Sequence, residues 1–247
     1  MQTVLPVCAD RSSNTPCLSP PGYARLTPLP PVGGVLFRGW LLSDFKQQDV
    51  QILDRKPGFQ GFYRLDVLSL RHRLFAGGWG PELRRELFVR PDAVCVLPYD
   101  PWLDTVVLVE QMRVGALDKR SSPWMLELVA GLFDADESPE QVAHREADEE
   151  AGLQLLELTP IIRYFPSPGG SNEHVHLYCA TVDSRGVGGV HGLPEEGEDI
   201  RVQVLSREAA LQALERGEID NAASIIALQW LQLHGQRLRE QAGPQPC

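Results

Sequence analysis

The part of this chain that most constrains its fold is the acidic stretch 131–153. Ser138 and Gln141 form a capping box around Pro139, which predicts that a helix begins at this proline. Gly152 supplies a residue that adopts the left-handed conformation easily, so it predicts the end of the same helix. The stretch is therefore interpreted as a loop, a capped helix and a defined stop.

Three carboxylates of the predicted helix share one face, because Glu146, Glu149 and Glu150 lie at positions i, i+3 and i+4. Such like charges repel one another, and no lysine lies among them. A hard divalent cation such as Mg²⁺ prefers oxygen ligands and would relieve the repulsion. A glutamate pair at i, i+4 is more often a solvated helix face, so the spacing alone leaves both interpretations open.

Composition narrows the class of protein. The formal net charge of −10 argues against a nucleic-acid-binding protein, which needs a basic surface. The five cysteines are scattered without CxxC spacing, so we expect reduced thiols in a cytoplasm rather than a zinc site or a disulfide framework. No apolar run reaches the roughly 20 residues that span a bilayer, and no signal peptide is expected.

The chain divides into four predicted parts. Residues 1–43 are rich in Pro, Gly and Ser and are expected to form a mobile extension. Residues 44–91 alternate like an antiparallel sheet, with strands expected at 50–53, 62–68, 70–75 and 82–90. Residues 92–241 are expected to form the main domain, followed by a tail at 242–247.

Strands and helices mix in the predicted main domain. Strands are expected at 93–98, 105–110, 155–158, 161–165, 174–181 and 200–205. Two further helices are expected, one from a Ser206 cap to Glu215 and one from Asn221 to Leu233. The fold class is therefore predicted as α+β, with a layered α/β/α arrangement.

The acidic stretch also matches a known motif, G-x5-E-x7-R-E-U-x-E-E-x-G-U, at every fixed position. The matching residues are Gly131, Glu137, Arg145, Glu146, Glu149, Glu150 and Gly152, with Ala147 and Leu153 in the apolar positions. The chain thus resembles the Nudix hydrolases. From about residue 44 to 241 it is similar to their bacterial ADP-ribose pyrophosphatase branch, which carries a proline shortly after the motif; here Pro168 follows Leu153 by 168 − 153 = 15 positions.

The resemblance implies a Nudix α/β/α sandwich with a mixed sheet, an N-terminal antiparallel β-sheet subdomain, and Mg²⁺, for which Mn²⁺ can substitute. The metal ligands that it implies are the carbonyl of Ala130 and the carboxylates of Glu146, Glu150 and Glu198. It assigns the catalytic positions to Glu196 as general base, with Glu149 and Arg145 in support. Glu195 remains a rival for the base, because a register error of one residue is easy in an acidic loop.

The resemblance further implies that the chain hydrolyses ADP-ribose, or a related nucleoside diphosphate sugar, to AMP and a sugar phosphate. The substrate-binding residues that it implies are Phe62, Tyr63, Arg85, Glu86, Arg90, Arg113, Leu132 and Glu173. It also implies a homodimer in which the N-terminal sheets are exchanged between subunits, with neither nucleic acid nor membrane as a partner.

Two alternatives stay open. The chain could hydrolyse other ADP-sugars, or it could be a non-catalytic ligand-binding regulator on a Nudix scaffold. The regulator is the less favoured, since such proteins often lack carboxylates of the motif and this chain has them all. His174 and His176 alternate on one predicted strand and could bind a metal, but nothing else of a zinc site accompanies them.

Overall fold

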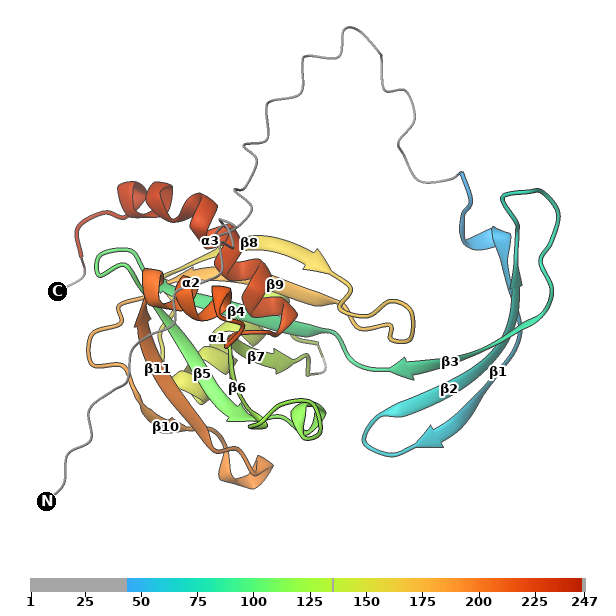
Figure 1. Ribbon diagram of the computed structural model, residues 1–247, viewed down its shortest axis with the longest axis horizontal. Coiled ribbons are helices and arrows are strands. Elements are labelled where there is room, and N and C mark those ends of the chain that lie inside the picture. Colours follow the sequence, from blue (N-terminus) through green and yellow to red (C-terminus); the bar gives the residue numbers. More distant parts are fainter. Residues whose placement is uncertain (1–43, 135, 246–247) are drawn as a thin grey trace, which may run out of the picture. The chain divides into compact units, whose positions relative to one another are not determined.

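The chain forms two β-sheets, of three and eight strands, in a computed structural model that describes residues 44–134 and 136–245 (Figure 1). The predicted N-terminal extension lies outside the described residues. Within the described part, no helix is long and apolar enough to cross a membrane. The division into separate domains stays a prediction.

The smaller sheet consists of β1 (Val50–Gln60), β2 (Arg64–His72) and β3 (Leu83–Val89), all antiparallel. The two segments predicted at 62–68 and 70–75 are parts of the single strand β2. A turn with positive φ at Gly77 and Gly78 lies between β2 and β3. Every residue of β1 is exposed.

The larger sheet has the order β10-β11-β5-β4-β9-β8, with β6 paired to β5 and β7 paired to β4. Only β4 and β9 pair in parallel among the pairings of this sheet in the described residues, so the predicted mixed sheet is confirmed. Its strands are β4 (Ala93–Asp100), β5 (Thr105–Met112), β6 (Trp124–Glu127), β7 (Val129–Leu132), β8 (Glu157–Tyr164), β9 (Val175–Thr181), β10 (Gly189–His191) and β11 (Ile200–Ser206).

Helices cover both faces of this sheet. Helix α1 (Pro139–Ala151) buries Val142, Ala143 and Ala147 against one face. Helices α2 (Arg207–Glu215) and α3 (Ala222–Gln241), red in Figure 1, pack their apolar side chains against the other face. Strand residues alternate between the two cores, as the period of two requires, and the layered α/β/α arrangement is confirmed.

The caps that position α1 are those predicted. The Ser138 hydroxyl accepts from the Gln141 N–H at 3.3 Å, and the Gln141 side chain accepts in return from the Ser138 N–H at 2.7 Å. Gly152 ends the helix with φ +60°. The predicted caps Ser206 and Asn221 likewise accept from backbone N–H groups of α2 and α3. The local sequence therefore sets where the acidic helix starts and stops.

Candidate active site

The most deeply placed acid of the site is Glu150, which is 2% exposed. Its Oε2 accepts from the Ala130 N–H of β7 at 2.9 Å, and its Oε1 accepts from the Gln111 amide of β5 at 3.4 Å. The helix α1 packs against β7, so the carboxylate of Glu150 lies next to the backbone of the residue whose carbonyl was predicted as a metal ligand. The structure thus brings Ala130 and Glu150 together.

Glu146 lies one turn earlier, over Gly131 of β7. A Cβ built on Gly131 would be 1.6 Å from Oε1 of Glu146, so any side chain at this position would occupy the space of the carboxylate. Glycine is therefore required at this position by close approach, rather than by a positive φ. Gly131 and Glu146, two fixed residues of the motif, therefore form one packing unit.

Arg145 connects the segment that precedes α1 to the helix itself. Its guanidinium forms ion pairs with Glu137 at 3.0 Å, Glu146 at 2.7 Å and Glu149 at 3.1 Å, the last at i, i+4 spacing. It also donates to the Leu132 carbonyl at 3.2 Å. Glu137 in turn accepts from the Asp134 N–H at 3.0 Å. Through these contacts Arg145 orients the carboxylates around it.

The electrostatics of the cluster oppose its own ionisation. Burial raises the pKa of Glu150 to about 8, and the nearby carboxylates of Glu146 and Glu198 add to the rise. Burial also raises the pKa of Glu146, against the lowering effect of Arg145, while Glu149 and Glu198 raise it further. The negative charge of Glu198, on the 192–199 loop, therefore acts on both acids of α1.

That loop begins after β10 and carries the remaining predicted acids. Glu195 and Glu196 lie in the short 3-10 helix η3 (Pro194–Glu196), and both are exposed. Glu198 is partly buried, and its Oε2 accepts from the Leu193 N–H at 3.0 Å. Gly197 ends the turn with φ +73°. The exposure of both glutamates leaves either free to approach a substrate.

The acids fit a divalent cation by their chemistry. Across the described residues, no group of three or more His, Cys, Asp or Glu side chains is arranged to hold a metal ion, because the carboxylates engage Arg145, Gln111 and backbone N–H groups instead. Nevertheless, burial and the neighbouring charge of Glu198 raise the pKa of both Glu146 and Glu150, and a bound cation would favour their ionised forms. Oxygen donors of this kind suit Mg²⁺.

A second group of predicted residues meets where the two sheets are joined. Arg90 forms an ion pair with Glu173 at 3.2 Å, and its guanidinium lies over the ring of Tyr63 at 5.0 Å. Phe62 contacts Tyr63 edge-on at 4.7 Å between ring centres, and its side chain is 88% exposed. Four of the predicted substrate-binding residues are therefore neighbours within one chain.

Other predicted substrate residues lie apart. Arg113, the residue after β5, pairs with Glu127 of β6 at 2.5 Å, and its charge acts to lower the pKa of Glu150. Arg85 and Glu86 lie on β3 in the smaller sheet, both exposed, and Arg85 donates to the carbonyl of its neighbour Arg84. Within one chain, therefore, only some of the predicted substrate-binding residues lie close together.

The histidine pair on β9 and just before it does not form a metal site. The ring of His174 lies on Phe165 at 3.6 Å between centres, and His176 lies 3.7 Å from Asp92. Burial lowers the pKa of His176. The two imidazoles thus take part in separate ring and ion contacts, and among the described residues they belong to no group of three or more metal-ligating side chains.

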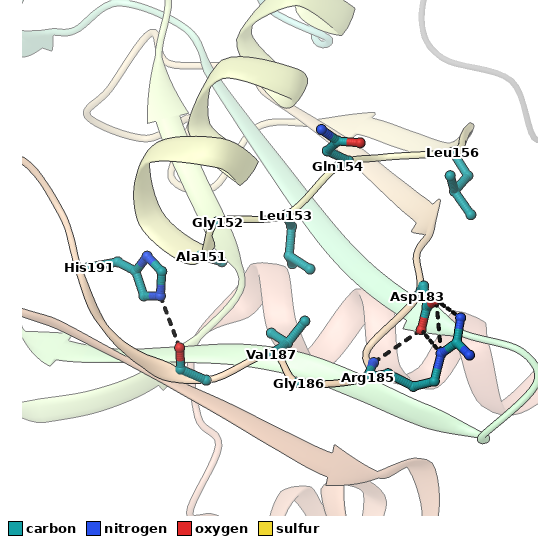
Figure 2. Close-up of a pocket in the computed structure, with 11 residues that line it drawn as sticks. Ala151, Gly152, Leu153, Gln154, Leu156, Asp183, Arg185, Gly186, Val187 and His191 are labelled. Atoms are coloured by element: carbon teal, nitrogen blue, oxygen red, sulfur yellow. Dashed lines mark hydrogen bonds and ion pairs between the residues drawn. The ribbon is translucent and has the colours of Figure 1, made fainter. Parts of the chain in front are cut away.

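A cavity of about 440 Å³ opens at the C-terminal end of α1, between Gly152, the 183–188 segment and His191 (Figure 2). None of the predicted catalytic, metal-binding or substrate-binding residues lines it. The candidate site is therefore separate from this hollow.

Sequence reasoning gave no role to Gln111, although its amide reaches Glu150. The available signal was a polar residue on the same strand face as Val107 and Val109, in an otherwise buried run. A buried polar side chain needs a hydrogen-bonding partner, and here the partner is the deepest carboxylate.

Comparisons with known proteins agree with this geometry. The pattern of the NUDIX domain matches residues 89–228. The chain is 50% identical over 197 residues to an ADP-ribose pyrophosphatase of Escherichia coli (strain K12), covering 80% of this chain and 94% of that protein. It is 45% identical over 202 residues to an ADP-ribose pyrophosphatase of Haemophilus influenzae, covering 81% and 93%. A crystal structure of an ADP compounds hydrolase shares the fold, with a TM-score of 0.59, 20% identity, and coverage of 78% of this chain and 99% of that one.

Proposed function

The chain belongs to the NUDIX family, and we propose from this premise that it is a Mg²⁺-dependent ADP-ribose diphosphatase. It is a hydrolase acting on phosphoric anhydrides, and ADP-ribose is the substrate that its relatives' names support. The observation that carries the proposal is the 50% identity over 94% of an ADP-ribose pyrophosphatase, in a chain that keeps the whole set of carboxylates on α1.

The ion would be held by Glu146 and Glu150 of α1, by Glu198 and by the carbonyl of Ala130; Mn²⁺ would bind the same oxygens. When bound, it neutralises diphosphate oxygens that otherwise repel an incoming nucleophile. Arg145 keeps the carboxylates oriented through its pairs with Glu146 and its neighbours. A positioned acid cluster of this kind supports catalysis by electrostatics set in advance.

Glu196 takes the proton from the attacking water. Its exposure on the 192–199 loop lets it reach a bound diphosphate. The water oxygen forms a bond to one phosphorus while the bridging P–O bond breaks, and the products are AMP and ribose 5-phosphate. A general base of this sort contributes about 10²- to 10⁴-fold to the rate.

Substrate recognition is assigned to the group formed by Phe62, Tyr63, Arg90 and Glu173, where an exposed ring can stack on adenine. Arg113 is assigned to the diphosphate, where a guanidinium fork suits phosphate oxygens. Arg85, Glu86 and Leu132 complete the proposed binding set.

We also infer a homodimer with exchanged N-terminal sheets, in which residues of both subunits build each site. The exposed apolar side chains of the smaller sheet support it, among them Ile52, Leu53 and Phe59. A cytoplasmic location is supported by the free thiols of Cys95 and Cys179.

Paired variants test the mechanism. We expect Glu196→Gln and Glu150→Gln to fold and to lower kcat for ADP-ribose by about 10²-fold or more. Glu195→Gln, next to the base on the same exposed turn, is the matched control and should stay within about threefold of the wild type. The reverse result for Glu195 and Glu196 would move the base by one residue, while near-normal rates in Glu150→Gln and both loop variants would refute the mechanism.

Substrate and reaction are tested by product analysis. AMP and ribose 5-phosphate should form from ADP-ribose with Mg²⁺ and stop with EDTA, and ¹⁸O-water should label one product. A higher kcat/KM for ADP-glucose would make the chain a pyrophosphatase for other ADP-sugars. Tight ADP-ribose binding without any AMP release would instead identify a regulator.

A further inference from the structure

His191 occupies the base of the loop that carries Glu196 and Glu198. It is the last residue of β10, and it pairs with Ile200, the first residue of β11. These two residues close the 192–199 loop at its root. His191 is also where this root meets the C-terminal end of α1, at Gly152 (Figure 2).

The imidazole is held at two points. Its Cε1 lies 3.0 Å from the position that a Cβ on Gly152 would take, so the ring packs directly over the glycine that ends α1. Its Nε2 lies 3.0 Å from the Gly188 carbonyl, drawn as a dashed line in Figure 2. A carbonyl only accepts, so Nε2 carries the proton and donates. The ring thus joins the helix end to the segment that precedes β10.

A backbone bond adds to this connection. The Gly192 N–H donates to the Glu149 carbonyl in the last turn of α1 at 3.2 Å. That turn also carries the deepest carboxylate, Glu150. Two consecutive residues of the loop root, His191 through its ring and Gly192 through its N–H, therefore contact the helix that holds the proposed metal ligands.

Beyond the root, the loop is a closed unit. The Leu193 carbonyl accepts from the N–H groups of Glu196 at 3.0 Å and Glu198 at 3.2 Å, and the Leu193 N–H donates to the Glu198 carboxylate at 3.0 Å. A Cβ on Gly192, where φ is +103°, would lie 2.6 Å from Cβ of Glu198. Because the loop folds back on its own root, the placement of the root sets the placement of both acids.

We propose that His191 is a positioning residue that fixes the loop of Glu196 and Glu198 against the end of α1. The proposal rests on the proposed function and deepens it by naming what aligns the two halves of the acidic site. Without the imidazole, the Gly192–Glu149 bond is the one contact between the root and α1, of those described above, that remains. The loop then departs more often from the position at which its acids meet those of α1.

Three substitutions separate the two contacts of the ring. His191→Ala removes both, His191→Phe keeps packing over Gly152 without the donor, and His191→Gln keeps a donor for Gly188 without the ring. The matched control is Val190→Ala on the same short strand, where the side chain is 68% exposed. The full chain is used throughout, and its thermal unfolding is recorded for every variant.

The first readout is amide hydrogen exchange of the metal-free protein. We expect His191→Ala to speed exchange at residues 192–198 by about tenfold, since local opening of a loop depends on the contacts that hold it. Phe and Gln should give smaller increases, and Val190→Ala should match the wild type. Exchange in the middle of α1 should not change in any variant.

The second readout is kinetic. His191→Ala should lower kcat for ADP-ribose roughly 10- to 100-fold, because a small misplacement of catalytic groups has a large effect. KM should change less than about threefold, Tm should fall less than about 3 °C, and His191→Gln or His191→Phe should recover part of kcat. If His191→Ala does not fold, the Gln and Phe variants carry both readouts.

Unchanged loop exchange in the His191 variants overturns the proposal. It is also overturned if exchange rises equally across α1 and β11 with a matching loss of Tm, which is general destabilisation. Failure of the proposed function looks different, because the wild type itself would then release no AMP. In that event the exchange measurement still decides whether His191 holds the loop, because it needs neither metal nor substrate.

Discussion

At the scale of the residue, the motif glycine Gly131 matters because it has no side chain. The carboxylate of Glu146 fills the volume above its Cα, and β7 pairs with β4 directly beneath. Loss of the Cβ is what lets helix and strand approach closely enough for Glu150 to reach the Ala130 N–H. The glycine thereby links strand geometry to the placement of two acids.

We expect Gly131→Ala to lower kcat/KM for ADP-ribose roughly 10²-fold, because the new methyl group must displace the Glu146 carboxylate. Tm should fall only moderately, since the obstructed group is the end of a flexible side chain. Gly169→Ala is the control, because a Cβ there meets nothing within 4 Å. Steady-state kinetics and thermal unfolding of the two variants decide it. Equal activity in both would contradict the packing argument.

Prediction at this scale succeeded where the cause is local. The capping box at Ser138 and the stop at Gly152 depend on residues a few positions apart, and both are confirmed. The contacts of Gln111 with Glu150 and of His191 with Gly152 join segments about 40 positions apart. No pattern within either segment specifies such a contact, because sheet order and helix placement determine it.

At the scale of the element, the carboxylate of Asp104 connects the turn between β4 and β5 to helices α2 and α3. Asp104, with φ +56°, accepts from Arg207 of α2 at 2.8 Å and from the Tyr99 hydroxyl at 2.7 Å, and Arg239 of α3 lies at 3.6 Å. The Arg207 hydrogen bond, followed by that of Tyr99, lowers the pKa of Asp104. The hairpin and the helices on one face of the sheet are thus joined electrostatically.

Asp104→Asn should therefore lower the free energy of unfolding at pH 7 by about 1 to 2 kcal/mol, a value reduced for partial solvent screening. Asparagine tolerates the positive φ, so the loss reports the charge. Because the folded pKa is depressed, the contribution is present above the unfolded value of about 3.9 and is lost as pH falls through the lower folded value. Urea unfolding at pH 7 and pH 3 should show the difference between variant and wild type shrinking in acid.

The control for this measurement is Asp54→Asn, whose side chain is 56% exposed beside Lys56. It should change stability little at either pH. A difference for Asp104→Asn that stays constant from pH 7 to pH 3 would show that shape, not charge, determines the effect.

Elements with strong periodicity were predicted well, whereas weak ones were missed. The strands β4, β5 and β9 and all three helices are present, although α3 runs on to Gln241 beyond the predicted Leu233. The strand β10 was not predicted, because three residues in a glycine-rich segment carry no alternation and form a strand only by pairing with β11. The predicted segments 155–158 and 161–165 correspond to one strand, β8, which is irregular near Pro160.

At the scale of the whole molecule, the smaller sheet exposes several large apolar side chains to solvent. Ile52 and Leu53 of β1 are about half exposed, and Phe59 of the same strand is 64% exposed. Apolar side chains gathered in this way mark an interaction surface. Within the proposed function, the occupant is the same sheet of a second copy, which would also supply Arg85 and Glu86 to the partner's site.

The last prediction follows from that arrangement. The wild type should sediment at twice 27.4 kDa, and Ile52→Asp should weaken the dimer at least about tenfold, because a buried charge at an apolar interface costs more than 1.4 kcal/mol. Activity should fall at low protein concentration and recover as concentration rises, since each site needs both subunits. Leu233→Asp, 81% exposed on α3, introduces the same charge outside the smaller sheet and should change neither mass nor activity. A wild type that stays monomeric yet fully active at every concentration would refute the exchanged dimer, and the substrate group of Tyr63, Arg90 and Glu173 would then have to act within one chain.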